Sequence, residues 1–211
     1  MTNSLNIHHQ DTLERYPDTS FPDIRQDTFS KTTLGFWLYL MTDCLLFATL
    51  FITYAVLHIE TFDGPSGKDL FIMPTAFTET MILLCSSVTC GMAVLAALRN
   101  DTYKVIAWLA VAFALGSAFM VMEWIEFNHL VQAGHDWTQS AFLSSFFTLV
   151  GTHGLHVSIG LLWMLVLIIQ LFCFGIDVMT FRRLVVFSMF WHFLDLVWIF
   201  IFTFVYLMGA I

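Results

Sequence analysis

The sequence predicts an all-α integral membrane protein, a bundle of five transmembrane helices. Of its 211 residues, 58% are hydrophobic and only 11% are charged, which is more apolar side chain than a soluble domain of this size can bury. Five apolar runs also reach the ~20 residues that a helix needs to cross a bilayer. The runs cover residues 32–58, 74–98, 103–130, 139–173 and 181–209. We therefore expect one transmembrane domain, 32–211, preceded by a polar tail, 1–31.

The tail carries five acids, three bases and two prolines but no apolar core, so we expect no cleaved secretory signal. The chain has a formal net charge of −8 and no basic stripe, which excludes nucleic acid as a partner. The segments outside the apolar runs are too small for a separate catalytic domain. Any chemistry must take place between the helices or in another chain.

The distribution of Lys and Arg predicts the orientation in the membrane. If the tail and the loops alternate between the two sides, one side receives Arg15, Arg25, Lys31, Arg99, Lys104, Arg182 and Arg183, and the other receives Lys68 alone. Positive residues accumulate on the cytoplasmic side. The N-terminus should be cytoplasmic and the C-terminus periplasmic.

The first span contains an acid near its middle. Asp43 lies eleven residues into the run, about 16 Å at 1.5 Å per residue and close to the midplane. Within the five spans, Lys and Arg occur only near the ends. Because burial disfavours a charge, an acid at this depth must be protonated, lean on a histidine, or find a cation on another subunit or a lipid head group.

The second and third spans carry acids toward their outer ends: Glu79 in the second, and Glu123 and Glu126 in the third. Glu126 and His129 match the Glu-x-x-His unit of di-iron helical bundles, to which Glu79 or Glu123 could add bridging carboxylates. Such a site needs two units, and the other polar pairs lie at a different depth. We therefore predict no metal site, and a self-contained di-iron membrane enzyme remains an alternative.

The fourth and fifth spans each carry a polar pair near the middle: His153 with His156, and His192 with Asp195. We expect these histidines to form hydrogen bonds between helices rather than to bind metal or haem. His192 and Asp195 should face a protein neighbour or each other, and not lipid.

Arg182 and Arg183 stand just before the fifth span, on the predicted cytoplasmic side. They are placed to hold lipid phosphates through bidentate contacts. Ordinary positive-inside anchoring explains them equally well.

Three segments show that the chain resembles subunit III of the haem-copper respiratory oxidases. They are Gly35 to Cys44, Gly151 to Val157, and Trp191 to Trp198. Within this family the five spans and the loop from Gly64 to Asp69 are most similar to the third subunit of bacterial cytochrome-bo-type ubiquinol oxidases. The resemblance covers nearly everything after Lys31.

The resemblance implies a non-catalytic subunit without its own redox cofactor, in a bacterial cytoplasmic (inner) membrane. Such a subunit packs on the haem- and copper-bearing subunit I, in a complex with subunits II and IV. In such a complex, a proton-pumping quinol oxidase, the partner subunits oxidise ubiquinol and reduce oxygen to water. Subunit III supports assembly and stability and holds phospholipid.

The resemblance also places several residues. Asp43 stands where relatives often carry a glutamate that has been linked to proton uptake or to an oxygen-facing lipid cleft. His153 and His156 match a paired histidine position of the family, and His192 with Asp195 matches its C-terminal pair. Glu126 matches an acidic position, and Glu79 looks characteristic of the quinol branch.

Other readings remain open. The same fold could serve a cytochrome c oxidase or a nitric oxide reductase as its third subunit. A small transporter is disfavoured by the odd number of spans.

Overall fold

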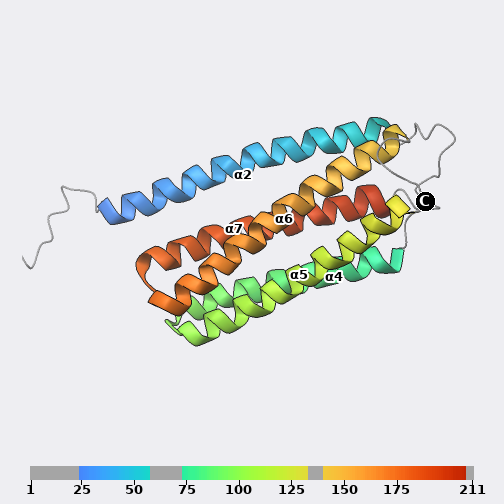
Figure 1. The fold of residues 1–211 in the computed structure, drawn as a ribbon. Helices are drawn as coiled ribbons and strands as arrows, with labels where there is room; N and C mark the ends of the chain where they lie inside the picture. Colours follow the sequence, from blue (N-terminus) through green and yellow to red (C-terminus); the bar gives the residue numbers. More distant parts are fainter. Residues whose placement is uncertain (1–23, 58–72, 133–139, 208–211) are drawn as a thin grey trace, which may run out of the picture. The chain divides into compact units, whose positions relative to one another are not determined.

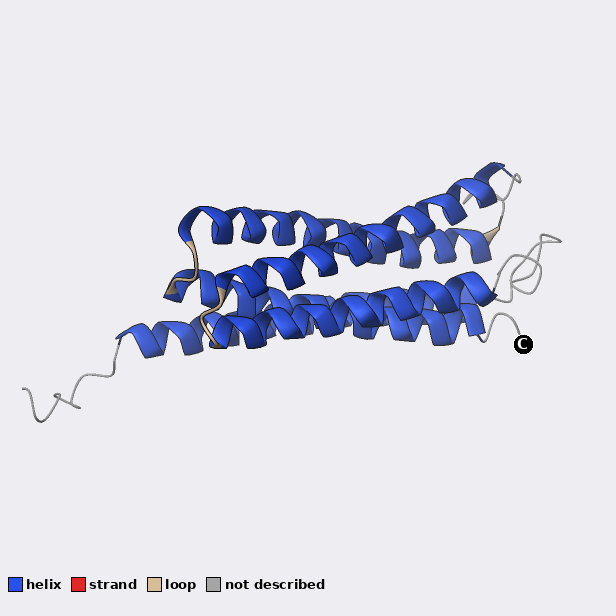
Figure 2. Ribbon diagram, turned by 90° about the horizontal axis from the view of Figure 1, so that it is seen from below, coloured by secondary structure: helices blue, strands red, loops and turns tan. Residues whose placement is uncertain are grey.

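The described residues of this computed structural model, 24–57, 73–132 and 140–207, fold entirely as helices and their short connections (Figure 2). The elements are α2 (Ile24–Leu57), α4 (Met73–Leu98), α5 (Thr102–Gln132), α6 (Ala141–Phe174), α7 (Val178–Ile201) and the π-helix η1 (Phe202–Leu207). Five helical segments are long and apolar enough to cross a membrane: Lys31–Leu57, Pro74–Leu98, Thr102–Gln132, Ala141–Phe174 and Val178–Leu207. The prediction of an all-α chain with five such helices is confirmed.

Two boundaries differ from the expectation. Helix α2 begins at Ile24, inside the predicted polar tail, because no proline or glycine follows Pro22 until Gly35 and polar residues are compatible with helix. The α-helical ladder of the last span ends at Ile201 and continues as a π-helix. The loop from Gly64 to Asp69 and Lys68 within it lie outside the described residues.

The chain divides into two compact units, Met1–Tyr39 and Leu40–Ile211, with the boundary inside α2. The described part of the first unit is the beginning of that helix. In the second unit, α4, α5, α6 and α7 form a four-helix bundle in which each packs on the next and α4 also packs on α7 (Figure 1). This antiparallel up-and-down order follows from the short connections between consecutive helices.

The second half of α2 packs through a narrow stripe of buried residues: Leu40, Asp43, Phe47 and Tyr54. The spacing of three and four places them on one helix face. Their neighbours lie on α6, where Phe47 contacts His156 and Tyr54 contacts Phe142. The packing of this stripe therefore places Asp43 against α6.

Local sequence explains where the helices of the bundle begin and end. Asn100 adopts a left-handed conformation with φ 57° after α4, which asparagine tolerates better than most residues. The side chain of Asp101 accepts a hydrogen bond from the Lys104 amide at the start of α5, and its bond to the Lys104 side chain holds the pKa of Asp101 below its usual value. Ser140 caps α6 by accepting from the Leu143 amide.

Trp191 fills the centre of the bundle. Its indole ring lies against Gly116 of α5 and Gly160 of α6 so closely that a Cβ at either glycine would come within 2.9 Å of the ring. Its Nε1 donates to the Ser86 hydroxyl of α4, which in turn donates to the Ala112 carbonyl of α5. One side chain of α7 thus joins all three neighbouring helices.

Candidate functional site

Asp43 and His156 meet between α2 and α6. The Nδ1 atom of His156 lies 2.7 Å from the Thr152 carbonyl oxygen, and a carbonyl only accepts, so Nδ1 carries the hydrogen. The Nε2 atom lies 3.5 Å from Oδ2 of Asp43. A neutral Nε2 and an ionised carboxylate would both be acceptors. A hydrogen bond between the two would need a proton on one of them, and within the described chain Oδ2 of Asp43 has no hydrogen-bond partner.

His153 lies beside this pair and is fully buried. Its ring is surrounded by aromatic rings of three other helices, with centroid distances of 6.4 Å to Phe47, 6.1 Å to Phe119 and 5.2 Å to Trp198. Neither ring nitrogen has a hydrogen-bond partner within the described chain. Within the described chain the prediction of interhelical hydrogen bonds therefore fails for His153, because its neighbours on the other helices are aromatic rings.

A second group, the acid cluster, consists of Glu79, Glu123, Glu126 and Tyr206. Glu79 and Glu123 are buried, and the three carboxyl groups lie close enough to repel one another. The Tyr206 side chain interacts with Glu126. Helices α4 and α5 and the π-helix η1 each contribute to the cluster. Elements 73–98 and 202–207 contain no Lys or Arg that could neutralise it.

The sequence predicts the common depth of the three acids but not the participation of Tyr206. The sequence feature that could have indicated Tyr206 is its position near the end of the last apolar run, at the same depth as the acids. His129 is exposed, and no group of three His, Cys, Asp or Glu within the described ranges is arranged to hold a metal ion. The Glu126-x-x-His129 unit is therefore not completed by the described donors.

His192 and Asp195 have different surroundings, although both belong to α7. Asp195 is buried against α4, where Ser87 and Cys90 are its neighbours. His192 is exposed, and its Nδ1 lies 2.6 Å from the Ser188 carbonyl of its own helix. The two do not pair, although their spacing places them only about 60° apart around the helix axis. Asp195 faces α4, whereas His192 lies on the rim and bonds its own helix.

Two tryptophan–hydroxyl pairs were not singled out from the sequence. Seven residues after Trp191, Trp198 donates its Nε1–H to the Thr80 hydroxyl of α4 at 3.1 Å. Its ring also meets Phe119 edge-on at 4.6 Å. The sequence feature that could have indicated these pairs is the seven-residue spacing of the two tryptophans, which places both on the same helix face. These pairs fix α7 on α4 and so position the polar groups between them.

Arg182 and Arg183 lie in the first two turns of α7, near its connection with α6. Arg183 is exposed and donates to the Gln170 side chain at 2.9 Å. Arg182 is partly exposed and also has an interaction partner. The Arg183 guanidinium carries five N–H donors, and the bond to Gln170 uses one of them.

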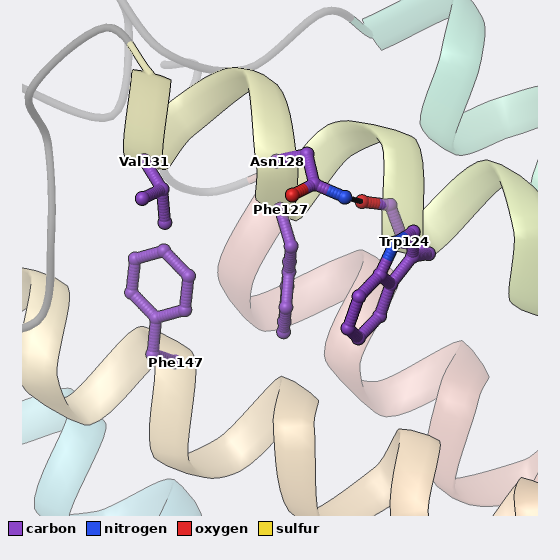
Figure 3. A pocket seen from close by; sticks show the side chains of 5 residues that line it. All are labelled: Trp124, Phe127, Asn128, Val131 and Phe147. Atoms are coloured by element: carbon purple, nitrogen blue, oxygen red, sulfur yellow. Dashed lines mark hydrogen bonds between the residues drawn. The ribbon is translucent and has the colours of Figure 1, made fainter.

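A pocket of about 330 Å³ opens at the far end of α5, between α5 and α6 (Figure 3). It is lined by Trp124, Phe127, Asn128, Val131 and Phe147. Asn128 is the polar side chain of this lining, and its amide donates to the Trp124 carbonyl. The other lining side chains are apolar or aromatic. The pocket suits an apolar chain or ring and contains none of the predicted site residues.

Comparison with known proteins agrees with this membrane architecture. Residues 26–210 match the family described as "Cytochrome c oxidase subunit III". The chain is 55% identical, over 98% of both proteins, to the cytochrome bo(3) ubiquinol oxidase subunit 3 of Pseudomonas aeruginosa. The predicted resemblance to this family and to its ubiquinol branch is confirmed.

Relatives with other names are also similar. The chain is 47% identical to the cytochrome c oxidase subunit 3 of Bacillus sp. (strain PS3), covering 84% of this chain and 86% of the relative. It is 42% identical to the quinol oxidase subunit 3 of Bacillus subtilis, covering 89% and 92%. With a family match over most of its length and relatives well above 30% identity, the chain belongs to the cytochrome c oxidase subunit III family of haem-copper oxidase subunits.

Proposed function

We propose that this chain is the third, non-catalytic subunit of a cytochrome-bo-type ubiquinol oxidase in a bacterial inner membrane. The observation that carries the proposal is the 55% identity to a ubiquinol oxidase subunit 3 over 98% of the chain. Ubiquinol oxidation and oxygen reduction belong to the haem- and copper-bearing subunit I. This chain would contact subunit I directly and share the complex with subunits II and IV.

The role of the chain in that complex is to support assembly and durability and to hold phospholipid. Many large apolar side chains are exposed on α2 and α6, among them Leu45, Leu162 and Phe172. In a membrane such surfaces contact lipid or other subunits. The Asp43–His156 pair at the contact of α2 and α6 is the group proposed to respond to turnover in a neighbouring subunit.

The orientation is part of the proposal. Residues 32–211 would form the membrane domain, with the tail 1–31 in the cytoplasm and the C-terminus in the periplasm. The uneven distribution of Lys and Arg supports it. Arg99, Lys104, Arg182 and Arg183 then lie at the cytoplasmic surface.

Arg182 and Arg183 are proposed to hold an anionic phospholipid head group at this surface. The double variant Arg182→Gln/Arg183→Gln should insert normally and carry less anionic lipid through purification, because the guanidinium donors and their charge are lost. Lipid extracted from the purified complex can be quantified by mass spectrometry. Arg99→Gln, at the same surface on another connection, serves as the control. Unchanged lipid content in the double variant would refute the lipid role.

The functional proposal is tested by purifying a tagged chain in mild detergent with its partners. A haem-containing partner in the eluate, visible in a reduced-minus-oxidised spectrum, together with oxidation of ubiquinol, is the expected result. Oxidation of cytochrome c in place of ubiquinol would favour the cytochrome c oxidase alternative. Iron in excess of haem iron, without a haem partner, would favour the di-iron alternative.

A further inference from the structure

His192 occupies an unusual position on the surface of the chain. It lies about halfway along the span Val178–Leu207 and is exposed. Polar and ionisable side chains at this depth almost always face protein or a water-filled cavity, since lipid tails cannot satisfy them. The described helices leave its outer side uncovered. Some other protein element should cover it in the membrane.

The hydrogen bonds of the ring define what that element must offer. Nδ1 lies 2.6 Å from the Ser188 carbonyl oxygen, so this nitrogen carries the hydrogen. In the neutral ring Nε2 is then an acceptor, and it lies beside Gly91 of α4. The complementary group is a hydrogen-bond donor.

The surface around Nε2 is shaped for a helix. A Cβ built at Gly91 would meet only Nε2, at 3.9 Å, within 4 Å, so the space above this glycine is open. We call Gly91 and His192 the notch. Its rim is apolar, with Val88 67%, Leu95 52% and Leu196 53% exposed. A small residue in an apolar helix face allows a second membrane helix to approach closely.

We infer that the notch is the docking surface for a transmembrane helix of a neighbouring oxidase subunit, which presents a hydrogen-bond donor to Nε2 of His192 at mid-membrane depth. The donor is a hydroxyl, amide, indole or protonated carboxyl group. This inference rests on the proposed function, because it requires an oxidase complex. Lipid head groups lie too far from the midplane. A second copy of the chain, docked symmetrically through the notch, would place the two Nε2 acceptors opposite each other with no donor between them.

The test places a photo-crosslinking amino acid, p-benzoylphenylalanine, at Val88 or at Leu95 in the tagged full chain, expressed with its partners. Ile159 of α6 is 51% exposed and serves as the control position for exposure alone. After irradiation of membranes, the expected result is a crosslink from Val88 and Leu95 to another oxidase subunit, several-fold stronger than from Ile159.

Variants of the notch connect the crosslink to its chemistry. His192→Leu removes the acceptor and should reduce the crosslink from Val88 several-fold, whereas His192→Gln retains an acceptor and should restore much of it. Gly91→Leu fills the notch and should also reduce it. Gly35→Leu is the matched control, because nothing lies within 4 Å of a Cβ at Gly35.

The outcomes separate this inference from the function on which it rests. If the haem partner copurifies but Val88 and Leu95 crosslink only to lipid, to a second copy of the chain, or no better than Ile159, the inference is overturned and the function stands. An unchanged crosslink in both His192→Leu and Gly91→Leu overturns it as well. If no haem protein copurifies, the proposed function and the inference both fail.

Discussion

Asp43 illustrates what a single buried residue can contribute to a non-catalytic subunit. Its carboxyl oxygen Oδ2 lies 3.5 Å from Nε2 of His156, whose other ring nitrogen is fixed by the Thr152 carbonyl. The imidazole cannot turn away without breaking that bond. The carboxyl group and the imidazole are therefore held face to face between two helices.

Asp43→Asn should separate proton exchange from packing. The Asn amide can still donate to Nε2 of His156, so we expect normal assembly and normal initial turnover. It cannot release a proton, so activity during sustained turnover should be lost several-fold faster than in the parent complex. Oxygen consumption followed over many turnovers measures this loss.

The control for Asp43→Asn is Asp177→Asn, because Asp177 is exposed before α7 and asparagine caps helices as well as aspartate does. It should inactivate at the parent rate. If the Asp43 variant also inactivates at that rate, the Asp43 carboxyl group has no part in the durability of the complex.

At the scale of single residues, the sequence predicts how far along its span a residue lies better than it predicts which atoms that residue contacts. The positions of Asp43 and His153 along their runs predict that both lie near the midplane, and both lie well away from the ends of their helices. Which atoms meet depends on the rotation of each helix about its axis. A rotation of one residue, 100°, separates the buried Asp195 from an exposed neighbour such as Leu196, and hydropathy alone does not fix it.

The helices of the bundle are held in register by close contacts around one ring. Gly116→Ala or Gly160→Ala would place a methyl group 2.9 Å from the Trp191 ring. Because this large ring is enclosed and bonded to Ser86, it cannot move aside cheaply. We expect each variant to lower the free energy of unfolding by about 1–3 kcal/mol. Titration of the purified protein with a denaturing detergent measures the change.

Gly35→Ala is the matched control for these two variants, since a Cβ there meets nothing within 4 Å. It should leave the stability unchanged or slightly raised, because alanine favours a helix more than glycine does. Equal stability of all three variants would show that the indole ring adapts, and that the contact does not set the helix spacing.

The acid cluster makes a prediction about the α4–α5–η1 contact. Three neighbouring carboxyl groups away from water and without a cation are best accommodated when they carry protons. We expect infrared spectra at neutral pH to contain carbonyl bands of protonated carboxylic acids that disappear in Glu79→Gln and Glu123→Gln. Both variants should fold, because glutamine has the shape of a protonated glutamate.

Asp195→Asn is the comparison for the cluster, since it removes a buried acid from a different contact and should leave these bands in place. Spectra that lack protonated-acid bands in the parent protein, or bands unaffected by either glutamine variant, would contradict the protonated cluster. A cation supplied from outside the described residues would then be required.

At the scale of elements, the number of spans followed from hydropathy, but their local geometry did not. Apolar length predicts that a helix crosses the membrane, and it contains no information on the hydrogen-bond register within the helix. The π-helix at Phe202–Leu207 was therefore not predicted. It supplies Tyr206 to the acid cluster.

The whole molecule is incomplete in a way that its family explains. Its polar groups at depth are only partly satisfied within the chain, and much of its apolar surface is exposed. Both features are expected for one subunit of a larger membrane complex, in which neighbours and lipid supply the missing contacts. Resemblance in three motifs identified that complex, whereas composition alone established only a five-span membrane protein.

Orientation is the property of the whole molecule that can be tested without its partners being known. The native cysteines, which would interfere with labelling, are first replaced by alanine; they are Cys44, Cys85, Cys90 and Cys173. A single cysteine is then introduced at Tyr103, which is 89% exposed at the start of α5, or at Gln132, which is exposed at its end.

The outer membrane of intact cells is first made permeable by a mild treatment, and a membrane-impermeant maleimide is then added. Under the proposed orientation, which places the end of α5 in the periplasm, Gln132→Cys should react, whereas Tyr103→Cys should react only in inverted membrane vesicles. The basis for this expectation is that Arg99 and Lys104 flank Tyr103, and positive residues favour the cytoplasmic side. The opposite labelling pattern would reverse the proposed orientation and move Arg182 and Arg183 to the periplasmic side, where their proposed role at the cytoplasmic leaflet would no longer hold.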